Sequence, residues 1–186
     1  RGDLSLSQSI LQRVSETYRK IRNTCRFLAG NLADFTAADR VPPDRLTPVD
    51  RWALNEVRRF HDAATTAYDR FEFHTVFHLL NRFCSTTLSA VYLDAVKDRL
   101  YCEPADSRIR RAAQTVMERA LRSLLAVMAP VLSFTAEEVW RAVRTPSDPE
   151  SVFLAEWPEM PAVDTAGIPW DGLFQVRDIV LKAIEA

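Results

Sequence analysis

Apolar positions near the start of the chain recur with the period of an α-helix. Steps of four and three residues alternate there, which places the apolar side chains on one stripe of a helix packed in a bundle. The stripe consists of Val14, Tyr18, Ile21, Cys25, Leu28 and Leu32. The pattern predicts a long helix that begins near Gln8 and ends at Gly30-Asn31.

Two further helical segments follow a connection over residues 33–46. Thr47 can cap the first of them, and Pro48 suits its first helical position. This helix is expected to reach about residue 70. The next segment runs from near Phe73 through Leu93 and breaks between residues 98 and 104. Its apolar residues lie on most sides, which predicts a central helix of the bundle.

The rest of the chain is expected to hold two more bundle helices and a less regular tail. Ser107 can cap a helix that is interrupted at Pro130, and the capping-box pattern Thr135–Glu138 predicts a shorter helix through Trp140. Alternation over 151–157 predicts a short strand. We therefore expect an all-α helical bundle over residues 1–145, a linker over 146–169, and the start of a C-terminal helix over 170–186.

Composition narrows the class of protein. With only 4 Gly, the chain has no glycine-rich loop to cradle a phosphate. It contains no apolar run long enough to span a bilayer and no signal peptide, and its 3 Cys are far apart, as is typical of a reducing compartment. A soluble, cytoplasmic protein is expected, with no membrane partner. Because Arg1-Gly2-Asp3 lacks a Met and the last helical pattern stops short, we interpret the sequence as a piece of a longer chain.

Charge is distributed unevenly. Residues 1–132 hold 20 Lys and Arg against 15 Asp and Glu, whereas residues 133–186 hold 4 against 10. Arg supplies 21 of the 24 basic residues, and the guanidinium group binds phosphates and stacks on bases better than an ammonium group does. A GC-rich genome that favours Arg codons would give the same excess, so charge alone does not decide between these explanations.

The basic residues of the first helix offer two interpretations. Arg19, Arg22 and Arg26 lie about one turn apart, on roughly the face opposite the apolar stripe. They form either a solvated surface or a face that grips the phosphates of a nucleic acid. In the second case Asn23 could read base edges and Tyr101, near a helix break, could stack on an unpaired base.

No enzymatic arrangement is evident in the sequence. His74 and His78 have the spacing of a metal-binding pair on a helix, but without further ligands nearby a core or solvated pair is the better interpretation. There is no Gly-x-Ser-x-Gly nucleophile elbow. The paired carboxylates Asp94 and Asp98 are better explained by ion pairs with Lys97 and Arg99.

Many short blocks of the sequence, in order over residues 8–158, resemble the anticodon-binding helical domain of isoleucyl-tRNA synthetase, a class I aminoacyl-tRNA ligase. The blocks are Tyr18–Thr24, Arg26–Leu28, Gly30–Leu32, Asp50–Ala53, Tyr68, Phe73-His74, Phe83-Cys84, Leu88–Ala90, Tyr92–Asp94, Lys97–Tyr101, Arg110-Arg111, Gln114-Thr115, Ala129-Pro130, Phe134-Thr135, Glu137-Glu138, Trp140, Ser151-Val152 and Trp157-Pro158. Valyl- and leucyl-type ligases share this bundle and form the alternative assignment.

The resemblance implies a parent enzyme that ligates isoleucine to its tRNA using ATP. The discrimination between isoleucine and valine by such an enzyme is a standard example of substrate selection. The catalytic His-Ile-Gly-His-like and Lys-Met-Ser-Lys-Ser-like motifs are missing from this sequence. The chain is therefore expected to carry no catalytic site and to bind no ATP, zinc or other cofactor itself. Its expected partners are the anticodon stem-loop of an isoleucine tRNA and the catalytic domain of the same chain, with no oligomer beyond the monomer.

The resemblance also places the RNA-binding residues. By similarity to the methionyl relative, the end of the first helix and the break after the third face the anticodon loop. These places are Asn23 with Arg26, and Lys97 through Tyr101, in this sequence. Within the expected RNA-binding set we assign Arg19, Arg22 and Arg26 to phosphates, Asn23 and Arg99 to base edges, and Tyr101 to stacking, with Lys97 as a further RNA-binding residue. Tyr18 and Trp140 are assigned to the core and Asp94 to an ion pair. The alternative is a docking or spacer bundle, with RNA recognition elsewhere in the parent protein.

Overall fold

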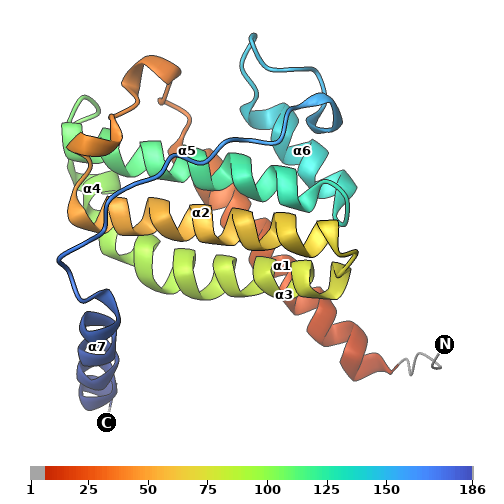
Figure 1. Ribbon diagram of the computed structural model, residues 1–186, viewed down its shortest axis with the longest axis horizontal. Helices are drawn as coiled ribbons and strands as arrows, with labels where there is room; N and C mark the ends of the chain where they lie inside the picture. Colours follow the sequence, from red (N-terminus) through yellow and green to blue (C-terminus); the bar gives the residue numbers. More distant parts are fainter. Residues whose placement is uncertain (1–6, 186) are drawn as a thin grey trace.

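The computed structural model describes residues 7–185, and every regular element among them is a helix, which confirms the all-α class. Arg1-Gly2-Asp3 lies outside the described residues. The elements are α1 (Gln8–Asn31), η1 (Ala37–Asp39), η2 (Pro43–Arg45), α2 (Pro48–Asp69), α3 (Phe73–Arg82), η3 (Phe83–Leu93), α4 (Asp94–Cys102), α5 (Arg108–Met128), α6 (Ser133–Val143), η4 (Val152–Leu154) and α7 (Trp170–Glu185). Figure 1 shows α2, α3 and α5 side by side, α1 crossing behind them, and α7 projecting from one end.

The helix ends follow the local sequence. Ser7 caps α1 by accepting a hydrogen bond from the backbone N–H of Ile10 at 3.3 Å. Thr47 caps α2 in the same way, with Pro48 at the first helical position, as predicted. The end of α1 at Asn31 also agrees with the prediction. Side-chain caps of this kind satisfy backbone donors that have no partner inside the helix.

The structure differs from the prediction for the third helix in two respects. Residues 73–102 form one continuous helical rod whose middle section, η3, is a π-helix. The central, most completely buried helix is instead α5. The helix after Ser107 was predicted, but its central position was not, because α5 carries buried polar side chains, among them Gln114 and Ser123. These are satisfied by other helices, since Gln114 donates to Asn31 O of α1 at 2.8 Å and Ser123 contacts His61 Nδ1 of α2 at 2.9 Å.

Two predictions near the C-terminal end of the bundle are wrong. The pattern at Thr135 does not start α6, which begins two residues earlier. Thr135 is buried within the helix, and its hydroxyl contacts Tyr18 Oη at 3.1 Å. The strand expected over 151–157 is replaced by the short 3₁₀-helix η4. The reason is a contact from α6, because the Glu137 carboxylate accepts from Ser151 Oγ and from Val152 N, both at 3.0 Å, and folds the chain into a turn.

The segment that leads from α6 to α7 is held to the bundle by aromatic contacts. Trp157 packs on the ring of His61 with 4.9 Å between centroids, and its indole N–H donates to Thr65 Oγ1 at 3.0 Å. At the start of α7, the ring centroids of Trp170 and Phe174 lie 5.9 and 4.8 Å from the ring centroid of Trp52. These contacts fix where the segment crosses α2. None of the helices described is both long and apolar enough to span a membrane.

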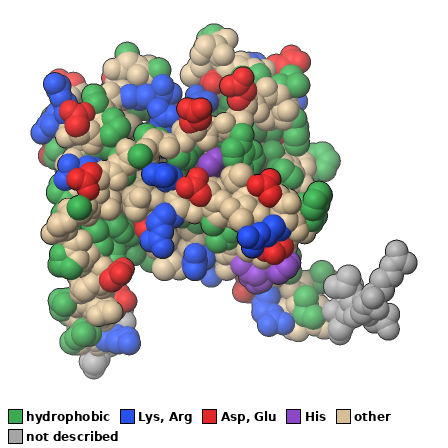
Figure 2. All heavy atoms as spheres, in the orientation of Figure 1, with side chains coloured by type: hydrophobic (Ala, Val, Ile, Leu, Met, Phe, Trp, Pro, Cys, Tyr) green, Lys and Arg blue, Asp and Glu red, His purple; other side chains and the backbone are tan. Residues whose placement is uncertain are grey.

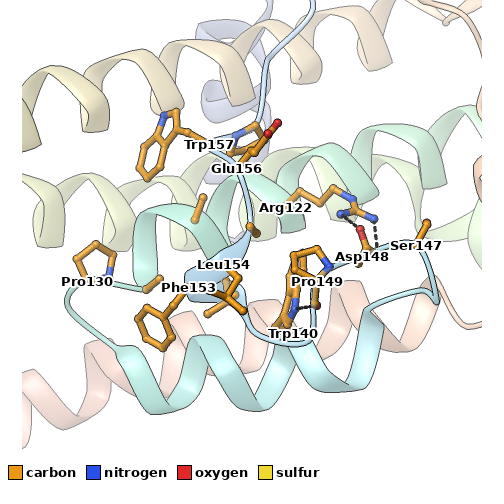
Figure 3. A pocket seen from close by; sticks show the side chains of 15 residues that line it. Arg122, Pro130, Trp140, Ser147, Asp148, Pro149, Phe153, Leu154, Glu156 and Trp157 are labelled. Carbon is orange, nitrogen blue, oxygen red and sulfur yellow. Dashed lines mark hydrogen bonds and ion pairs between the residues drawn. The ribbon is translucent and has the colours of Figure 1, made fainter.

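A hollow of about 750 Å³ lies between α5, α6 and residues 147–158, and its polar edge is an ion pair (Figure 3). Arg122 donates to both carboxylate oxygens of Asp148, at 2.9 and 3.2 Å. Trp140 lies beside this pair, with the Arg122 guanidinium 5.8 Å from its ring centre and its own N–H donating to Pro149 O at 3.0 Å. Trp140 is buried in the core, as predicted.

Asp148 makes the stability of this end of the bundle dependent on acid pH. Burial alone would raise its pKa, but hydrogen bonds from Arg122 and Thr145 outweigh burial and lower the pKa from 3.8 to about 2. A depressed carboxyl pKa stabilises the fold above about pH 4 and loses that contribution as the pH falls through 2. We expect a loss on the order of 1 kcal/mol over this range, because both partners are partly solvated.

Chemical denaturation of wild type and Asp148→Asn between pH 2 and pH 6 tests this expectation. The wild-type advantage is expected above pH 4 and to shrink toward pH 2. An advantage of equal size at every pH would assign the effect to shape rather than to charge.

Candidate nucleic-acid interface

A groove of about 680 Å³ lies between α1, η3 and α4, and we call it the α1–α4 groove. Its lining residues are Lys20, Asn23, Thr24 and Phe27 from α1, Ser85, Ser89 and Leu93 from η3, and Asp94, Lys97 and Tyr101 from α4. Asn23 therefore meets Lys97 and Tyr101 at one site, although 78 residues separate Asn23 from Tyr101 in the sequence. The structure brings together three of the seven predicted RNA-binding residues here.

Small polar side chains form part of the groove lining. Thr24 of α1 lies against Ser89 of η3 with 3.4 Å between their hydroxyl oxygens, while its hydroxyl also donates to Lys20 O. Ser85 points its hydroxyl back onto Asn81 O at 2.7 Å. Because these side chains are short, the two helices approach closely and still leave room above them. A π-helix at this position fits the frequent occurrence of such segments at functional sites.

Aromatic rings and charges surround the opening of the groove. Phe27 is half-buried on α1, whereas Tyr101 on α4 is 67% exposed and leaves a ring face accessible. Lys97 donates to Asp94 at 3.1 Å, and this hydrogen bond raises the pKa of Lys97. The ion pair confirms the role predicted for Asp94. An aromatic ring beside ammonium groups is a suitable surface for a single-stranded nucleic acid.

The arginines of α1 do not share one environment. Arg19 and Arg26 are exposed, and no ion pair to either is found among residues 7–185. Arg22 instead donates to Glu138 of α6 at 2.7 Å. Arg19 and Arg26 are therefore available cations on α1, although neither lines the groove, whereas Arg22 must leave Glu138 to reach a phosphate.

Arg99 has a structural partner that sequence reasoning missed. The pairing expected between Arg99 and Asp98 is replaced by one between Arg99 Nη1 and the buried carboxylate of Asp50, at 3.2 Å. Asp50 also accepts from Tyr92 Oη at 2.8 Å and from the hydroxyl of Thr47. This network joins α4 to the first turn of α2 and sets the direction in which Lys97 and Tyr101 face.

The face formed by α2 and α3 has mixed charge. Figure 2 shows Lys and Arg side chains interspersed with Asp and Glu side chains there. Arg58 lies 3.5 Å from Asp62 and Arg59 lies 2.9 Å from Glu56, so these two arginines of α2 are offset by carboxylates of the same helix. Such a surface has little net attraction for a polyanion.

The two histidines whose spacing suits a metal pair are both exposed on α3. His74 Nε2 lies 3.3 Å from Thr75 Oγ1. Within residues 7–185, no three His, Cys, Asp or Glu side chains lie close enough to hold a metal ion.

Several groove residues were not identified from the sequence. Lys20, Thr24 and Phe27 lie on α1 at spacings of four and three, so they share a face with Asn23. Ser85 and Ser89 repeat at four residues on η3. These spacings were visible in the sequence, but they become informative only once the facing helix is known.

The chain belongs to the family of anticodon-binding domains of tRNA ligases, whose family model matches residues 50–186. Over its whole length it is 46% identical to an isoleucine–tRNA ligase of Moorella thermoacetica and 49% identical to one of Desulforudis audaxviator. It is also 46% identical to an isoleucine–tRNA ligase of Geobacter sulfurreducens. The chain spans about 20% of the length of each of these curated relatives.

Proposed function

We propose that this chain recognises the anticodon stem-loop of an isoleucine tRNA as the non-catalytic domain of a monomeric, cytoplasmic isoleucine–tRNA ligase. The observation that carries the proposal is the α1–α4 groove, where Asn23, Lys97 and Tyr101 from distant parts of the sequence line one opening. Ligation of isoleucine and the use of ATP would belong to other parts of the parent protein.

The groove residues and the arginines outside the groove have distinct roles in this proposal. Arg19, Arg26 and Lys97 contact phosphates, which supplies most of the affinity. Asn23 contacts the edge of an unpaired base, and Tyr101 stacks on one. Arg99 acts by holding α4 against Asp50 in place of the base-edge role expected from the sequence.

Titration with an isoleucine-tRNA anticodon stem-loop tests the proposal directly. Binding is measured at two salt concentrations, beside a stem-loop whose anticodon bases are changed. We expect salt-dependent binding that is tighter for the unchanged loop. Equal binding of both loops would mean that the site contacts phosphates without reading the anticodon bases. Binding of neither loop would place recognition in another part of the parent protein.

The exposed arginines give a second prediction, for the salt dependence of this binding. Arg26→Ala is expected to lower the slope of log K against log salt by about 0.7–0.9, the value for a single neutralised phosphate. Arg58→Ala, on the mixed-charge face of α2, is the matched control and is expected to leave the slope unchanged. An unchanged slope for Arg26→Ala would remove that residue from the interface.

A further inference from the structure

Asp94 places a negative charge at the edge of the α1–α4 groove. It is exposed and lines the groove, where it would repel the phosphates of a bound RNA. In the structure this charge is offset by Lys97, whose amine is 3.1 Å from Oδ1. If Lys97 turns to an RNA phosphate, the Asp94 carboxylate loses this partner and opposes binding.

A second cation approaches Asp94 from the far end of the chain. Arg177 of α7 donates from Nη2 to Ala90 O at 2.7 Å, and the same nitrogen lies 4.0 Å from Asp94 Oδ2. Arg177 also contacts Asp178 at 3.4 Å, and its side chain is 35% exposed. The Ala90 hydrogen bond holds the guanidinium beside the carboxylate oxygen that Lys97 does not use.

We propose that Arg177 is a positioning residue of the anticodon site, which neutralises Asp94 when Lys97 moves from it to the RNA. The inference rests on the proposed function and adds α7, which does not line the groove, to the elements that govern RNA affinity. Asp94 thus has one cation partner on each side, and only Lys97 exchanges between protein and RNA. Arg177 remains fixed by Ala90.

A double-mutant cycle tests this role with Arg177→Ala, Asp94→Asn and the double variant of the chain, titrated with the anticodon stem-loop. Arg177→Ala is expected to weaken binding about 3- to 5-fold, the upper end of the effect of a partly solvated charge pair. Asp94→Asn is expected to bind the loop more tightly than wild type, because a repulsive charge is removed. In the Asp94→Asn background, Arg177→Ala is expected to change affinity less than about twofold.

Controls separate this role from a loss of folding and from failure of the proposed function. Lys182→Ala, on the same helix as Arg177, is expected to bind like wild type, and thermal unfolding is measured for every variant. An equal loss in both backgrounds would show that Arg177 acts only through the Ala90 anchor and would overturn the proposal, as would no loss in either. If wild type itself does not bind the stem-loop, the proposed function fails instead.

Discussion

Arg99→Ala is expected to lower the free energy of unfolding by about 3 kcal/mol, far more than the loss of any exposed ion pair on the same helix. Removing one partner of a buried ion pair costs about 3–5 kcal/mol, because the remaining charge stays buried without compensation. The Asp50 carboxylate is fully buried, so it would be left in this state. Tyr92 and Thr47 would still donate hydrogen bonds to it, which places the cost at the lower end of that range.

Urea or thermal unfolding of two variants on the same helix measures this effect. Lys97→Ala is the matched control, since the Lys97–Asp94 pair is exposed on both sides and is expected to contribute little to stability. The double change Asp50→Asn with Arg99→Met is expected to recover part of the loss, because it removes both buried charges. If Arg99→Ala unfolds at the same urea concentration as Lys97→Ala, the structural role is contradicted.

The importance of Arg99 could not be derived from the sequence. Asp50 lies 49 residues away in the first turn of α2, where an acidic residue is typical of a helix start and needs no buried partner to explain it. Arg99 lies next to exposed residues of both charges, so Asp98 was the obvious partner. Only the folded bundle, in which Arg99 of α4 reaches the first turn of α2, brings the two groups together.

Local rules nevertheless accounted for most of the helices. The cap at Thr47 and the stop at Asn31 depend on a few neighbouring residues, so they were predictable. The strand near Val152 and the helix start at Thr135 were wrong because contacts from outside the local sequence decide both. Glu137 folds the first into a turn, and Tyr18 gives the buried Thr135 hydroxyl a partner from another helix.

At the candidate site, too, some features could be predicted from the sequence and others depend on packing between helices. Asn23, Lys97 and Tyr101 were placed by a family resemblance, whereas their meeting in one groove follows from the packing of α1 on η3. The Arg177–Asp94 approach had no sequence signal, because the two residues lie 83 positions apart on separate helices. Patterns within one helix therefore predict which face is exposed, and packing between helices decides what that face can bind.

Tyr101→Ala is expected to weaken binding of the anticodon stem-loop by about 1–3 kcal/mol, the range found when an aromatic ring that stacks on a base is removed. The ring is 67% exposed and lines the groove beside Lys97, so it has a free face for a base. The same exposure means that the substitution removes little packing. The free energy of unfolding is therefore expected to change by less than about 0.5 kcal/mol.

Tyr101→Phe is the control that separates stacking from hydrogen bonding. It keeps the ring and removes only the hydroxyl, so wild-type affinity is expected if a base stacks on the ring. If Phe binds as weakly as Ala, the hydroxyl makes the contact and Tyr101 reads the RNA by hydrogen bonding. If both variants bind like wild type, Tyr101 lies outside the interface, and recognition must depend on the α1 side of the groove, where Asn23 and Phe27 lie.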